Sequence, residues 1–205
     1  MSVGGSGPFS FTGVEDFQID TRLRLPGGYV IAVAPGTHAV TEIVPRGWRL
    51  TGIACMGTST VNLPGATASV TVAAGERVRC TFTNEKLGRI EIVKTLRGER
   101  TTAFSFSAPF SLVPAGLFTL TPSLAAGSAR RDFVDVPAGS YTIGEIGPPN
   151  GFRLLSVQCT DPSGGTVSSP VTGEAIIGLA AGETVTCAFD NATLGTIIVG
   201  AVSFL

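Results

Sequence analysis

The sequence has little charge and almost no histidine. Charged residues make up 14% of its 205 residues, the formal net charge is −1, and His38 is the single histidine. This balance excludes the basic surface with which proteins bind nucleic acid or anionic membranes. One histidine cannot supply a Ser-His-Asp or Cys-His arrangement to both halves of the chain. Because the cysteines also lack Cys-x-x-Cys spacing, we expect no metal, no cofactor and no enzyme activity.

Long apolar runs are also missing. No stretch reaches the roughly 18 consecutive apolar residues that a membrane-spanning helix needs, so no membrane span is predicted. Residues 1–10 have neither the basic region nor the apolar region of a signal peptide. We interpret the chain as a mature form, a form with an added Met1, or a segment of a longer chain.

What the sequence does contain is an internal repeat. Three pairs of segments match: residues 9–12 with 104–107, residues 35–55 with 138–159, and residues 73–84 with 180–191. One residue is inserted near Pro149 in the second copy. A repeat of this length indicates two domains in tandem.

Within each copy the apolar residues alternate with polar ones, as in β-strands. One predicted strand face carries Val78, Cys80, Phe82 and Asn84, and its counterpart carries Val185, Cys187, Phe189 and Asn191. Gly and Pro turns bound every such run, and no segment has a helical period. The predicted fold is all-β, with two tandem immunoglobulin-like antiparallel β-sandwich domains. The predicted boundaries are 1–86, 87–192 and a C-terminal extra strand, 193–205.

Each copy has two cysteines at equivalent places, Cys55 with Cys80 and Cys159 with Cys187. Within each pair, the strands would be neighbours or would face each other across a sandwich. We therefore predict one disulfide per domain rather than buried free thiols. The bridges would close loops of 80 − 55 = 25 and 187 − 159 = 28 residues. Disulfides indicate an oxidising compartment, so we expect an extracellular or cell-surface location.

Residues 136–145 read Val-Pro-Ala-Gly-Ser-Tyr-Thr-Ile-Gly-Glu and are followed by Pro-Pro-Asn-Gly-Phe152. This pattern resembles the prealbumin-like, collagen-adhesin B-type (SpaA-like) modules of bacterial surface proteins and pilins. The endings Cys-Thr-Phe-Thr-Asn84 and Cys-Ala-Phe-Asp-Asn191 are similar to the disulfide-containing branch of that family. The resemblance covers most of both copies. It implies prealbumin-like sandwiches that serve as stalk, spacer or pilus modules.

The resemblance also implies an intramolecular Lys–Asn isopeptide bond promoted by a nearby acid. In copy two, Lys94, Glu145 and Asn191 each fall on the apolar face of a predicted strand. Burial there favours the neutral amine, which could attack the Asn191 carbonyl while a protonated Glu145 polarises the oxygen and moves the proton. This would be a single autocatalytic event without turnover. In the alternative, Lys94 extends to water at a strand end and the other two are merely hydrogen-bonded.

The two ends of the chain are complementary. Glu42 and Asn84 of copy one match Glu145 and Asn191, but nothing ahead of Phe9 corresponds to the Lys94 strand. Residues 194–205 align with the opening of copy two and form an apolar strand with no domain after it. This candidate donor strand comprises Thr196, Ile197, Ile198, Val199 and Val202, with Ala201 at the position of Lys94.

We therefore expect a non-enzymatic structural protein of a surface fibre, pilus or adhesin stalk. Its partner would be a second copy, joined head to tail by donation of the C-terminal strand to the first domain. Alternatives are a segment of a long multi-repeat adhesin, completed by neighbouring repeats, and a module that binds a carbohydrate, a protein or another host ligand. Trp48 and Phe152, which follow turns, either pack at the ends of the sandwiches or serve as ligand contacts.

Overall fold

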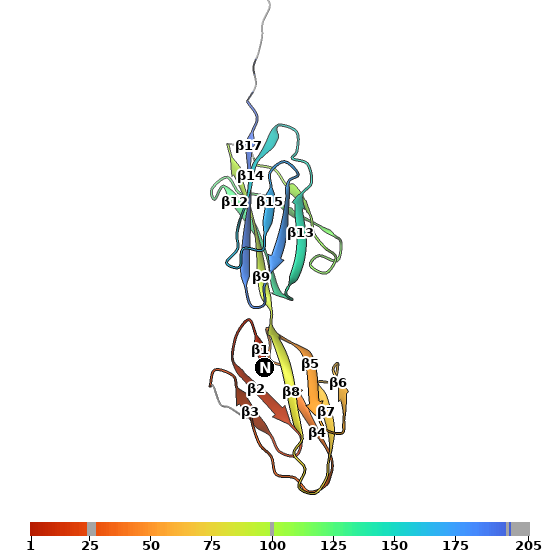
Figure 1. The fold of residues 1–205 in the computed structure, drawn as a ribbon. Coiled ribbons are helices and arrows are strands. Elements are labelled where there is room, and N and C mark those ends of the chain that lie inside the picture. The colour runs from red at the N-terminus through yellow and green to blue at the C-terminus, as the bar shows by residue number, and fades with distance from the viewer. Residues whose placement is uncertain (24–27, 99–100, 196, 198–205) are drawn as a thin grey trace, which may run out of the picture. The chain divides into compact units, whose positions relative to one another are not determined.

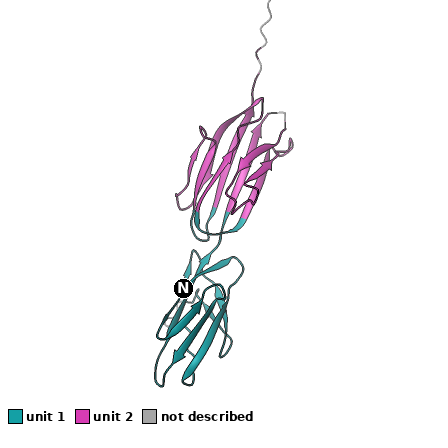
Figure 2. Ribbon diagram, turned by 90° about the vertical axis from the view of Figure 1, so that its right-hand side faces the viewer, with its two compact units in different colours: residues 1–89, 134–139, 179–184 teal, residues 90–133, 140–178, 185–205 magenta. Residues whose placement is uncertain are grey.

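The computed structural model describes residues 1–23, 28–98, 101–195 and 197, and it is built of β-strands and turns (Figure 1). No helix in the described part of the chain is long and apolar enough to cross a membrane. The chain divides into two compact units, coloured separately in Figure 2. Unit 1 comprises residues 1–89, 134–139 and 179–184, and unit 2 the remainder.

Unit 1 contains a five-stranded sheet of order β3-β2-β4-β7-β6 and a three-stranded sheet of order β1-β8-β5. The strands are β1 (Ser2–Val3), β2 (Pro8–Thr12), β3 (Phe17–Asp20), β4 (Gly36–Ile43), β5 (Trp48–Met56), β6 (Ser59–Asn62), β7 (Thr67–Val72) and β8 (Arg79–Lys86). Phe9, Phe11, Ala68 and Phe82 form the core of this unit. They come from both sheets, as expected for a sandwich whose strands alternate inward and outward residues.

Unit 2 contains a five-stranded sheet of order β11-β10-β13-β16-β15 and a four-stranded sheet of order β12-β9-β17-β14. The strands are β9 (Gly88–Arg97), β10 (Phe104–Ser107), β11 (Leu117–Leu120), β12 (Ser128–Val136), β13 (Gly139–Glu145), β14 (Phe152–Thr160), β15 (Val167–Ser169), β16 (Glu174–Leu179) and β17 (Thr184–Thr193). Its buried residues include Ile90, Ile92, Phe104, Ile143, Ile177 and Phe189. The predicted all-β class and tandem sandwiches are therefore confirmed.

The cysteines lie directly opposite each other on neighbouring strands of one sheet. Cys55 of β5 pairs with Cys80 of β8, and Cys159 of β14 pairs with Cys187 of β17. Each pair forms a disulfide. Of the two arrangements that the sequence allowed, the structure has neighbouring strands rather than strands facing across the sandwich.

The two units differ in the length of their first strand, which is β1 in unit 1 and β9 in unit 2. Unit 2 has the ten-residue β9 between β12 and β17. At the corresponding edge, unit 1 has only the two-residue β1, which pairs in parallel with β8 at Asn84 and Glu85. The glycines at positions 4, 5 and 7 follow at once and favour turn over strand. Unit 1 therefore has a two-residue strand where unit 2 has a ten-residue strand.

Candidate functional site

The candidate site of unit 2 is a group of three polar side chains in the sandwich interior. Lys94 lies in β9, Glu145 ends β13, and Asn191 lies in β17. Lys94 and Asn191 are fully buried, and Glu145 is 8% exposed. They point inward because each continues the inward-facing register of its strand, after Ile90 and Ile92, after Tyr141 and Ile143, and after Cys187 and Phe189. The structure thus brings together the three residues that the sequence singled out.

Hydrogen bonds connect all three side chains. Lys94 Nζ donates to Asn191 Oδ1 at 2.7 Å and lies 3.4 Å from Glu145 Oε2. Asn191 Nδ2 donates to Glu145 Oε1 at 2.6 Å. Since a C=O bond is about 1.23 Å long, Lys94 Nζ lies within about 3.9 Å of the Asn191 amide carbon. The amine is therefore close to the carbon that it would attack.

Lys94 extends into the protein rather than to water. Its Nζ also donates to the backbone carbonyls of Phe189 and Thr95, both at 3.0 Å, and lies 4.4 Å from the centroid of the Phe104 ring. Burial lowers the pKa of the Lys94 ammonium from 10.5 to about 8, and the carboxylates of Glu145 and Asp190 oppose part of this fall. With this pKa, roughly a tenth of the amine is neutral, and therefore nucleophilic, at pH 7.

Glu145 contacts the nitrogen of the Asn191 amide, whereas the sequence-based mechanism had it polarising the amide oxygen. One carboxylate oxygen faces Lys94 Nζ and the other accepts from Asn191 Nδ2. This geometry suits a proton carrier that takes a proton from the attacking amine and delivers it to the departing nitrogen. The Asn191 oxygen instead receives its hydrogen bond from Lys94 itself.

Unit 1 repeats two of the three residues. Asn84 Nδ2 donates to Glu42 Oε1 at 2.6 Å, the same bond that joins Asn191 and Glu145. Both side chains are buried, at 2% and 3% exposure. The amino group of Met1 donates to the Phe82 carbonyl. Residue 82 corresponds to residue 189 in the repeat, so this amine contacts the carbonyl equivalent to one that Lys94 contacts.

The two candidate ligand-contact residues pack within their own units. Phe152 is 7% exposed and its ring packs edge to face on Phe104, with centroids 5.6 Å apart. It therefore offers no ring to a ligand, because the residue after the turn points into the core. Trp48 is half-buried and packs on Phe9 at 5.0 Å.

The remaining observations concern His38, metal binding and the candidate donor strand. His38 Nε2 is hydrogen-bonded to the Ala34 carbonyl. In the described ranges, no three His, Cys, Asp or Glu side chains are grouped to hold a metal ion. Among the donor-strand residues, Ile197 is 90% exposed. The others, Thr196, Ile198, Val199 and Val202, lie outside the described residues together with Ala201.

The chain is also similar to several solved structures, at low sequence identity and low TM-score. The major pilin from Streptococcus pyogenes is 13% identical, with a TM-score of 0.38, over 94% of this chain and 93% of that one. The minor pilin GBS52 from Streptococcus agalactiae is 10% identical, with a TM-score of 0.33, over 97% and 87%. The pilus adhesin SpaC from Lactobacillus rhamnosus GG, in its open conformation, is 16% identical, with a TM-score of 0.36. That match covers 94% of this chain and only 29% of the adhesin.

No curated protein matches the chain. The model of the prealbumin-like fold domain matches residues 1–86 and again residues 90–193. These two matches follow the internal repeat and take in both disulfides and both Glu–Asn pairs. The chain therefore belongs to the family of prealbumin-like fold domains, and it carries two of them in tandem.

Proposed function

We propose that the chain is a non-enzymatic, extracellular structural module of a surface pilus or adhesin stalk. The observation that carries this proposal is the buried Lys94–Glu145–Asn191 group, because its geometry suits one permanent cross-link rather than turnover. Family membership and the pilins and pilus adhesin among the similar structures support the same function. The disulfides support an oxidising, extracellular location.

The cross-link would be an amide between Lys94 and Asn191. The neutral amine attacks the Asn191 carbon, a C–N bond forms, the bond to Nδ2 breaks, and ammonia leaves after Glu145 has transferred the proton. Lys94 and Asn191 are 97 residues apart. The chain-entropy relation used for disulfides gives about 4–5 kcal/mol of stabilisation for a loop of that length. Such a bond would make the module hard to unfold, as a stalk requires.

We further propose that modules polymerise head to tail by strand donation. Unit 1 has only a two-residue strand beside β8, and residues 194–205 repeat the apolar pattern that opens β9. The tail of one copy would pair with β8 of the next, and a contact of this kind repeats into an open filament. Because Ala201 stands at the position of Lys94, packing and backbone hydrogen bonds alone would hold this joint.

The test compares the full chain with a variant that lacks residues 195–205, at high concentration. We expect filaments or higher oligomers of the full chain by negative-stain imaging and size-exclusion chromatography, and monomers of the variant. A matched control replaces Ile198 and Val199 by Lys, which removes the apolar pattern at unchanged length. A full chain that stays monomeric rules out self-polymerisation and favours a segment of a longer array.

A further inference from the structure

Asp190 is a buried carboxylate that the proposed cross-linking reaction does not use. It lies in β17 directly before Asn191 and is 8% exposed. Because adjacent residues of a strand face opposite sides of the sheet and Asn191 faces the core, Asp190 lies on the outer face. A carboxylate that has lost most of its water is unfavourable unless neighbouring groups bind it. Its neighbours therefore show what the residue does.

Two residues of β9 bind this carboxylate. Thr95 Oγ1 donates to Asp190 Oδ1 at 3.0 Å, and Arg97 Nη2 lies 2.6 Å from Asp190 Oδ2. Thr95 and Arg97 are two positions apart on β9, so they share one face, and Lys94 lies on the other. These contacts therefore join β9 to β17 on the outer face, next to the place where Lys94 meets Asn191 on the inner face.

A second contact on the outer face agrees with the same strand register. Thr186 Oγ1 donates to Glu91 Oε2 at 3.3 Å. This pair and the Thr95–Asp190 pair are each separated by 95 residues in sequence. Equal separations mean that β9 and β17 run in the same direction and are paired in one register. A slip of one residue would turn Lys94 to the outer face, away from Asn191.

The carboxylate is a difference between the two copies of the repeat. Thr83 stands at the position equivalent to Asp190, in the matching endings that run from Cys80 to Asn84 and from Cys187 to Asn191. The Thr83 carbonyl accepts a hydrogen bond from the Thr51 hydroxyl of β5. A prealbumin-like sandwich thus forms with an uncharged residue at this position. The carboxylate accompanies β9, the strand that carries Lys94.

Asp190 also acts on Lys94 through its charge. In the described part of unit 2, the charged groups close to Lys94 are Glu145 of β13, Asp190 of β17 and, bound to Asp190, Arg97 of its own strand. β10 contributes the uncharged Phe104 ring. Burial lowers the pKa of Lys94, and the carboxylates of Glu145 and then of Asp190 raise it. The charge of Asp190 therefore leaves a measurable mark on the amine.

We propose that Asp190 is a positioning residue for the Lys94–Asn191 cross-link. Held by Thr95 and Arg97, it fixes β9 on β17 in the register that places Lys94 Nζ against the Asn191 amide. It forms no bond with the reacting atoms. A misplacement of about 1 Å at a reacting centre lowers the rate on the order of 10²-fold. This inference rests on the proposed cross-link and adds a residue outside the Lys–Glu–Asn group.

The test follows the loss of ammonia by intact mass while the unfolded full chain refolds at a series of pH values, with circular dichroism reporting folding separately. Asp190→Ala removes both contacts and should slow the loss at least tenfold at high pH, where the amine is neutral whatever its pKa. Thr95→Val should also slow it, without moving the pH at which the rate is half-maximal.

The conservative variant Asp190→Asn separates position from charge. It keeps an oxygen that can accept from Thr95, so the rate at high pH should stay close to the wild-type rate. Its rate should rise at a lower pH than the wild-type rate, because the Lys94 ammonium loses a neighbouring negative charge and deprotonates more readily. A residue that merely supported the fold would leave this pH dependence unchanged.

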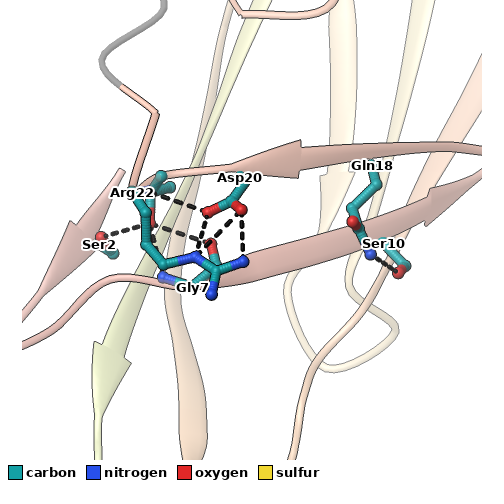
Figure 3. A network of polar contacts seen from close by, with 7 residues as sticks. Ser2, Gly7, Ser10, Gln18, Asp20 and Arg22 are labelled. Carbon is teal, nitrogen blue, oxygen red and sulfur yellow. Dashed lines mark hydrogen bonds and ion pairs between the residues drawn. The ribbon is translucent and has the colours of Figure 1, made fainter.

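Asp20 of unit 1 provides the matched control. Figure 3 shows its carboxylate facing the Arg22 guanidinium, and the two groups are 2.5 Å apart. The side chains of Arg22 and Asp20 are 61% and 19% exposed, close to the 75% and 12% of Arg97 and Asp190. Asp20→Asn thus removes a similar ion pair from the other unit. It should change neither the rate of ammonia loss nor its pH dependence.

Hydrogen exchange gives a second readout that does not need the reaction. In the Asn191→Ala background, which cannot form the amide, adding Asp190→Ala should speed the exchange of backbone amides in residues 91–97, and adding Asp190→Asn should speed it less. Equal rates of ammonia loss and equal exchange with and without Asp190→Ala would overturn the inference while the wild-type mass deficit remained. A wild-type chain of full mass would instead overturn the cross-link itself, and with it the role of Asp190 in that reaction.

Discussion

At the scale of single residues, the cost of burying Lys94 decides the chemistry of unit 2. An ammonium without solvent is unfavourable unless it is paired or becomes neutral. Lys94 has both options, because Glu145 lies 3.4 Å away and burial favours the neutral amine. The proposed amide with Asn191 would remove the charge permanently.

The first prediction at this scale concerns the mass of the chain. After full reduction of the disulfides, we expect the intact mass to fall short of the calculated value by one ammonia. Glu145→Gln should restore the calculated mass, because glutamine cannot accept and release the proton. The matched control in unit 1, Glu42→Gln, should keep the deficit. Tandem mass spectrometry should locate the bond between Lys94 and Asn191, and a wild-type chain of full mass would contradict the proposed amide.

The second prediction concerns pH and uses Asn191→Ala, which cannot form the amide. The pKa of Lys94 is about 8 when folded and near its ordinary 10.5 when unfolded. Between these values the unfolded chain binds more protons, so the free energy of unfolding should rise with pH, by up to about 3 kcal/mol in all. Below about pH 8 Lys94 is protonated in both states, so the free energy of unfolding stays at its lower value and no longer changes with pH through this group.

Denaturant unfolding between pH 7 and 10.5 checks this dependence. The double variant Asn191→Ala with Lys94→Met provides the reference, since it keeps Glu145 and Asp190 but has no amine at this position. The rise with pH should be present in the single variant and absent from the double one. Equal slopes would show that Lys94 titrates normally in the folded protein.

Much of this site could be predicted from the sequence, because alternation alone puts Lys94, Glu145 and Asn191 on inward faces. Alternation does not give the contacts between strands, so the bond from the Asn191 nitrogen to Glu145 was not predicted. The Phe152 ring illustrates the same limit. A turn before it allows either burial or exposure, and only the packing against Phe104 decides between them.

At the scale of elements, strand register separates residues that are adjacent in sequence. Ile177 of β16 is fully buried, and Ile176 beside it is 47% exposed. Two isoleucines at adjacent positions thus lie on opposite faces of one strand, one in the core and one in solvent.

We expect Ile177→Ala to lower the free energy of unfolding of unit 2 by about 2–5 kcal/mol, since it leaves a cavity in the core. Ile176→Ala should change it by about 0.5 kcal/mol or less, because the side chain stays largely in water. Guanidinium unfolding of both variants in the Glu145→Gln background, without the proposed amide, makes the comparison. Similar losses would mean that the register of β16 differs from the one described.

Some elements followed from the sequence and others did not. The predicted strand with Val185, Cys187, Phe189 and Asn191 on one face is β17, whose four residues are all buried. β12 is different, because its charged residues weaken the alternating pattern and its place depends on β9 beside it. Residues 28–33 match β12 by position and form no strand, since unit 1 has no ten-residue neighbour for them.

At the scale of the whole molecule, the internal repeat predicts two similar sandwiches, and the structure has them. Each unit has its own two sheets, disulfide and Glu–Asn pair. Among the residues that the structure describes, the strand with the buried lysine, β9, belongs to unit 2. The repeat could be read directly, whereas the unpaired Asn84 oxygen required coordinates.

The position of the Lys94–Asn191 pair has a mechanical consequence. β9 and β17 are the first and last strands of the second sandwich and are neighbours in one sheet. With the amide in place, tension pulling on the chain from both sides of this sandwich passes directly from Lys94 to Asn191. The residues between them then bear none of the load. Under tension, only the segments before Lys94 and after Asn191 could extend, and the module between them would keep its length.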